Sequence, residues 1–213
     1  MDAPRVAVIP TASGLEHGMP ERWNALGEAH FRELGATVTP IRLITRMDAA
    51  DTELVERLRN QHLYYFSGGS PDYIIETLHE TSAWTTIANA HRAGAIIAGC
   101  SAGAMMLGGY TVSVRRILAG EPPRWRQALG LVPGLAIMPH FDRSRQFMSA
   151  DRFAELLQSA PCGITMVGID EETALVRLPH ASRWSVTGRR TVSVFGDDGR
   201  AHVYRAGDTI DLS

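Results

Sequence analysis

The chain has 213 residues, of which 45% are hydrophobic and 21% charged, values typical of a globular protein with one packed core. Its formal net charge is −2, so we expect no basic surface for nucleic acid or an anionic membrane, and the partner should be small. All 21 basic residues are arginine, which excludes Schiff-base chemistry, a Ser-Lys dyad and a phosphate-loop lysine.

Localisation is predicted from what the sequence lacks. The N-terminal segment has no charged leader before a long apolar stretch, and no run of 18 apolar residues occurs. Two cysteines, Cys100 and Cys162, are too few for a disulfide framework. We therefore expect a cytoplasmic protein whose cysteines are both reduced.

Apolar runs alternate with helical stretches in the first half of the chain, as in a parallel sheet with crossover helices. Strands are predicted at 5–9, 37–41, 63–66 and 95–99. Helices are predicted at 20–35, between Pro20 and Gly35, and at 52–60, capped by Asp51. Two more are predicted after the cap Ser70 with Pro71, and over 101–107.

The second half begins with a strand at 135–138 and a helix with one apolar face, made by Phe147, Ala150, Phe153, Ala154 and Leu157. From residue 164 onward strand patterns follow one another with little helix between them, and "DDG" at 197–199 predicts a hairpin turn. We interpret these strands as an antiparallel extension of the same sheet. The chain is therefore predicted to be a single α/β domain over residues 1–213.

The segment "GCSAG" matches G-x-S-x-G, the sharp turn between a strand and a helix that exposes a serine hydroxyl. Here Ser101 follows a predicted buried strand and precedes a predicted helix, which is the context that the motif requires. The glycines are expected because side chains would strike neighbouring backbone at so tight a turn. The N–H of Ala102, at the start of the helix, can stabilise an oxyanion.

A serine nucleophile needs a base and a carboxylate that orients it. Two histidines follow a predicted strand end at a proline, namely His140 and His180. Asp170, Glu171 and Glu172 lie between two strands with apolar flanks, and Asp142 is a further candidate acid. The residues alone leave these alternatives open.

Four segments together resemble the dipeptidase E and cyanophycinase family of serine peptidases, peptidase family S51. They are "YYFSGGSPDYIIETL", "GCSAGAMML", "LGLVPGLAIMPHFDRSRQ" and "GIDEETALV", in the order of the family. The resemblance implies Ser101 as nucleophile, His140 as general base and Glu171 as orienting acid, with the N–H groups of Gly69 and Ala102 as the oxyanion hole.

The resemblance also implies the fold and the mode of action. Members are similar in being cytoplasmic hydrolases without a cofactor, often dimeric. Their fold is a flavodoxin-like three-layer α/β sandwich, with a mostly parallel sheet and helices on both faces. A possible homodimer and a small peptide substrate are thus expected. Metal catalysis is not expected, since "HETSA" at 79–83 lacks the second histidine of H-E-x-x-H.

One departure from the family concerns the residue before the nucleophile, which is Cys100 where members commonly carry Trp or Thr. Cys100 is off centre between the glycines, so its side chain is expected to point away from the cleft. Thiol chemistry is accordingly disfavoured.

Substrates divide the family. Dipeptidase E members cleave after an N-terminal aspartate, and cyanophycinases cut a β-linked Asp-Arg polymer. An aspartate side chain needs an arginine fork, for which Arg143 and Arg145 are candidates, although either could be a solvated charge. The short chain favours a hydrolase of small peptides, with a cyanophycinase-like activity, an esterase or a non-catalytic member of the fold as alternatives.

Overall fold

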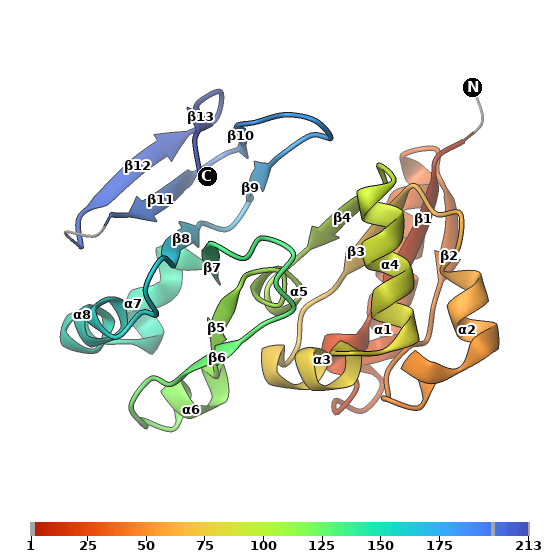
Figure 1. Ribbon diagram of the computed structural model, residues 1–213, viewed down its shortest axis with the longest axis horizontal. Coiled ribbons are helices and arrows are strands. Elements are labelled where there is room, and N and C mark those ends of the chain that lie inside the picture. The colour runs from red at the N-terminus through yellow and green to blue at the C-terminus, as the bar shows by residue number, and fades with distance from the viewer. Residues whose placement is uncertain (1–2, 197–198, 213) are drawn as a thin grey trace. The chain divides into compact units, whose positions relative to one another are not determined.

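In the computed structural model, which describes residues 3–196 and 199–212, the first half of the chain forms a parallel sheet with helices between its strands (Figure 1). The strands are β1 (Arg5–Ile9), β2 (Thr37–Pro40), β3 (Leu63–Phe66) and β4 (Ile96–Gly99), in the spatial order β2-β1-β3-β4. The α-helices are α1 (Met19–Glu33), α2 (Thr52–Arg57), α3 (Pro71–Leu78), α4 (Ser82–Arg92) and α5 (Ala102–Met105). Two short 3-10 turns, η1 (Thr11–Ser13) and η2 (Asp48–Ala50), follow β1 and β2.

Local signals account for where several of these helices begin. The side chain of Asp51 accepts a hydrogen bond from the Leu54 N–H at 2.9 Å, and so caps α2 as predicted. Ser70 caps α3 in the same way, and Pro71 stands at the first helical position. Helix α4 was not predicted, and Thr81 caps it by accepting from the Trp84 N–H.

Helices cover both faces of the parallel sheet. Phe31 of α1 packs edge-on against Tyr65, with ring centroids 5.3 Å apart, whereas Trp84 of α4 packs against Phe66. Tyr65 and Phe66 are neighbours in β3, and successive side chains of a strand point to opposite faces. The predicted α/β sheet with helices on both faces is thus confirmed.

The chain divides into two compact units, Met1–Ala104 and Met105–Ser213. The second unit contains β5 (Tyr110–Val112), α6 (Val114–Leu118), β6 (Trp125–Gln127), β7 (Leu135–Pro139), η3 (Phe141–Arg143), α7 (Ser144–Phe147) and α8 (Ala150–Gln158). It continues with β8 (Thr165–Ile169), β9 (Thr173–Val176), β10 (Trp184–Gly188), β11 (Thr191–Phe195), β12 (Ala201–Arg205) and β13 (Thr209–Ile210). That the whole chain is one domain remains a prediction.

Strand pairing in this unit is mostly antiparallel, as predicted for the C-terminal part. One sheet has the order β12-β11-β8-β7, in which only β7 and β8 are parallel. A second sheet has the order β13-β10-β9, and β5 pairs with β6 as a hairpin. The turn predicted at 197–199 includes residues 197 and 198, which lie outside the described residues.

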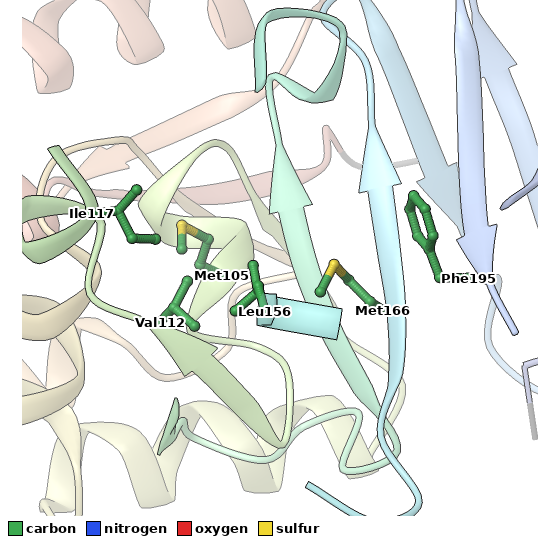
Figure 2. Close-up of a cluster of buried hydrophobic side chains, with 6 residues drawn as sticks. All are labelled: Met105, Val112, Ile117, Leu156, Met166 and Phe195. Carbon is green, nitrogen blue, oxygen red and sulfur yellow. The ribbon is translucent and has the colours of Figure 1, made fainter. Parts of the chain in front are cut away.

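A buried apolar cluster joins the helices of this unit to its strands (Figure 2). Leu156 of α8 and Met166 of β8 lie in it together with Phe195 of β11. Its other buried members are Met105, Val112 and Ile117. The cluster fixes β8 within the unit, and β8 leads directly into the acidic segment 170–172.

Two predictions about elements need correction, and a hairpin was missed. The helix expected over 101–107 ends at Met105, and the one with the apolar face is broken, because Met148 is extended and Ser149 caps α8 anew. The hairpin β5–β6 with α6 was not predicted. Among the residues that the structure describes, no helix is long and apolar enough to cross a membrane.

Candidate active site

Ser101 occupies a strained turn between β4 and α5. Its φ of 53° lies in the left-handed region, which is uncommon for a residue other than glycine. A side chain on Gly99 would overlap the Gly103 carbonyl, and one on Gly103 would overlap the Phe66 carbonyl. Both glycines of the predicted motif are therefore required by close backbone contact. The turn has the strand-to-helix context of a nucleophile elbow.

The loop after β3 lies beside this turn. A side-chain carbon added to Gly68 would lie 3.2 Å from Cβ of Ser101 and 3.6 Å from its Oγ. Gly69 has φ 143°, and any side chain there would overlap the Ala12 carbonyl. The Ser70 N–H donates to that carbonyl at 2.7 Å. The Gly68–Gly69 loop is thus held by η1 and lies beside the serine.

The helix after Ser101 supplies one further donor. The N–H groups of Gly103 and Ala104 donate to the carbonyls of Cys100 and Ser101 at 2.9 Å, and the N–H of Ala102, the first of α5, precedes them. The N-terminal end of a helix carries partial positive charge. Ala102 is buried, whereas Ser101 is half-buried.

Cys100 lies away from this arrangement. It interacts with Tyr65, whose pKa is raised to about 12, chiefly by burial and further by the charge and hydrogen bonding of Cys100. Tyr65 faces α1, so Cys100 points to that side of the sheet. That Cys100 is not the nucleophile remains a prediction. Both cysteines are free thiols.

In the second unit, strand register brings His140 and Glu171 together. Strands β7 and β8 run parallel with Pro139 opposite Ile169, so the residues that follow each strand emerge at the same edge. Nδ1 of His140 lies 3.1 Å from Oε1 of Glu171. His140 also has left-handed backbone, with φ 53°. Because Nδ1 is engaged, Nε2 is the nitrogen that remains for proton transfer.

The other candidate acids have different partners. Oδ1 of Asp142 accepts a hydrogen bond from the Glu171 N–H at 3.0 Å. This hydrogen bond, with help from Arg190, holds the pKa of Asp142 below its usual value. Asp170 accepts from the backbone N–H and hydroxyl of Thr191. Glu172 lies 3.5 Å from Nη1 of Arg189, so Glu171 is the carboxylate that contacts the histidine.

Of the two candidate arginines, Arg143 is close to the acid. Its Nη2 lies 2.8 Å from Oε2 of Glu171, so one carboxylate is shared between Arg143 and His140. The side chain of Arg145 lies outside the described part of the structure. His180 is exposed, and within residues 3–196 and 199–212 it makes no hydrogen bond or ion pair.

Sequence reasoning missed Arg190 and Thr173. Arg190 forms an ion pair with Asp142, and its N–H donates to Oγ1 of Thr173. Neither contact follows from a motif, because the first depends on the pairing of β11 with β8 and the second on the pairing of β10 with β9. As for metals, no cluster of three or more His, Cys, Asp or Glu side chains suited to an ion occurs in the described residues.

A strained serine between a strand and a helix of an α/β fold is an arrangement that α/β-hydrolases share. Residues 1–181 match the model of peptidase family S51, and the chain belongs to this family. It is therefore a peptidase, in agreement with the enzyme class and the resemblance predicted from the sequence.

One solved structure supports the same assignment, and a second supports the fold. A peptidase from an acI-B1 Actinobacterium shares 31% identity, with a TM-score of 0.87 over 97% of this chain and 83% of its own. A candidate peptidase E protein from Listeria monocytogenes EGD-e shares 20% identity, with a TM-score of 0.63 over 87% of this chain and 86% of its own, which shows likeness of fold alone. No curated protein matches the chain.

Proposed function

We propose that the protein is a serine peptidase that cleaves short peptides through Ser101, His140 and Glu171. The observation that carries the proposal is the hydrogen bond between Glu171 and Nδ1 of His140, since it leaves Nε2 as a base. The strained turn at Ser101 supports this serine as the nucleophile that His140 deprotonates.

In the proposed reaction, Nε2 of His140 takes the proton of the Ser101 hydroxyl while Oγ attacks the peptide carbonyl carbon. The N–H groups of Gly69 and Ala102 stabilise the resulting oxyanion. His140 then gives its proton to the leaving amine, and the C–N bond breaks. Water hydrolyses the acyl-enzyme by the same route. Glu171 orients the imidazole and stabilises its charged form throughout.

For specificity, we propose that Arg143 takes the side-chain carboxylate of an N-terminal aspartate. Its guanidinium carries five N–H donors in a planar fork, and Glu171 contacts Nη2. About half of the side chain is exposed, at 52%, so a second carboxylate can approach it. A dipeptidase E-like preference for Asp-X peptides follows.

The test compares the wild type with Ser101→Ala, using a fluorophosphonate probe and a panel of Asp-X, Leu-X and β-Asp-Arg peptides. We expect the wild type to be labelled and to cleave Asp-X peptides fastest, and the variant to do neither while remaining folded. Cys100→Ala is the matched control and should retain labelling. Peptidase activity that survives in Ser101→Ala would refute the mechanism. Preferred cleavage of β-Asp-Arg would instead identify a cyanophycinase-like enzyme.

A further inference from the structure

Arg190 lies beyond residues 1–181, the part of the chain that matches the family, and immediately precedes β11. Its guanidinium forms an ion pair with Oδ2 of Asp142. Its backbone N–H donates to Oγ1 of Thr173 at 3.0 Å. Arg190 thus contacts both Asp142 and Thr173, the two residues that flank Glu171 in the structure.

These two groups hold the backbone of Glu171 from both sides. Asp142 Oδ1 accepts the Glu171 N–H at 3.0 Å, and the Thr173 hydroxyl donates to the Glu171 carbonyl at 3.2 Å. The ion pair with Arg190 engages the other oxygen of the same carboxylate, Oδ2. The ion pair with Arg190 therefore keeps Asp142 oriented toward Glu171.

We propose that Arg190 is a positioning residue for Glu171, acting through Asp142 and Thr173. It does not touch His140 or the reacting atoms in this arrangement. Its role is to fix the peptide of Glu171 so that Oε1 meets Nδ1 of His140. The inference rests on the proposed function, in which Glu171 orients the base.

The expected consequence follows from the geometry. Without the guanidinium, Oδ2 of Asp142 loses its partner, and the carboxylate can turn away from the Glu171 N–H. A displacement of about 1 Å in a catalytic group can cost on the order of 10²-fold in rate. Because Thr173 still holds the carbonyl side, we expect a smaller effect, about 10-fold.

The test uses Arg190→Gln and Arg190→Lys, with Arg189→Gln as the matched control. Arg189 is the neighbouring arginine, 80% exposed, and pairs with Glu172 at 3.5 Å. Two quantities are measured in the full chain. The first is the second-order rate of labelling by a fluorophosphonate. The second is the low-field proton NMR signal of the His140 Nδ1–H, which reports the hydrogen bond to Glu171 without any substrate.

We expect Arg190→Gln to label about 10-fold more slowly and to lose or shift the Nδ1–H signal. Arg190→Lys should recover part of both, since an ammonium can still pair with Asp142, and Arg189→Gln should match the wild type. Asp142→Asn should reproduce the effect of Arg190→Gln, and the double variant should be no worse than either. If Arg190→Gln does not fold, Asp142→Asn alone tests whether the Arg190–Asp142 pair positions Glu171.

Wild-type labelling and an unchanged Nδ1–H signal in both Arg190→Gln and Asp142→Asn would overturn the inference. Equal losses in Arg189→Gln would do the same. If the wild type itself is not labelled, the proposed function fails, and the NMR signal alone then judges the role of Arg190.

Discussion

The carbonyl oxygen of Phe66 occupies the place where a side chain on Gly103 would begin. Gly103→Ala must therefore push α5 away from β3, at a cost of roughly 1–3 kcal/mol for such overpacking. We expect a lower midpoint in guanidinium unfolding and loss of fluorophosphonate labelling, because the elbow moves with the helix. Gly134→Ala is the control, since an added carbon there meets nothing within 4 Å. Equal behaviour of the two variants would contradict this account.

Glu171→Gln keeps the shape of the side chain and removes its charge. Loss of the corresponding carboxylate in a serine triad lowers kcat by about 10⁴-fold, because the imidazole is no longer oriented and its charged form is not stabilised. We expect a fall in kcat of about 10³–10⁴-fold with little change in KM, measured on the best peptide of the panel. Glu172→Gln should differ little from the wild type. A large loss from Glu172→Gln alone would transfer the role to that residue.

Arg143→Gln separates two roles of the same guanidinium. If Arg143 binds an aspartate side chain, the variant raises KM for Asp-X peptides and leaves Leu-X peptides unaffected. If it only holds Glu171, kcat falls for both kinds of peptide. We expect a fall in kcat for both and an additional rise in KM of about 10-fold for Asp-X, as for loss of one charged hydrogen bond. Equal KM changes for the two peptides would exclude the specificity role.

Stability at acid pH depends on Asp142, whose pKa is lowered in the folded protein by the Glu171 N–H and by Arg190. A carboxylate with a lowered folded pKa stabilises the fold above its unfolded pKa, near 3.8, and this stabilisation is lost as pH falls through the folded value. Asp142→Asn should therefore lose stability at pH 7 and show a weaker decline between about pH 5 and pH 2. Urea unfolding at several pH values, with Asp211→Asn as control, measures both. An unchanged acid decline would show that Asp142 is not linked to folding.

Much of the first unit could be predicted because its signals are local. Caps such as Asp51 and Ser70, and the glycines around Ser101, act within a few residues. The hairpin at 110–127 was missed because its strands have three residues each, and their pairing depends on packing with distant segments. The break of the helix at Met148 was not predicted, because the apolar residues on either side of it continue the same helical spacing.

The site shows the same division. The motif around Ser101 is contiguous and could be read directly, whereas the choice among Asp142, Glu171 and Glu172 depends on the register of β7 against β8. A shift of one residue would direct a different carboxylate to His140. The ion pair between Arg190 and Asp142 could not be predicted at all. It depends on the pairing of β11 with β8, which has no sequence signature.

Ser101 and His140 share the same backbone φ of 53°, a value that glycine adopts more readily than any other residue. Glycine would relieve the strain at either position, but it would also increase the conformational freedom of the unfolded chain, and at 140 it would remove the hydrogen bond to Glu171. Neither backbone conformation requires the side chain that it carries. If Ser101 and His140 act as proposed, selection of this chain for heat resistance alone would leave both side chains free to be lost.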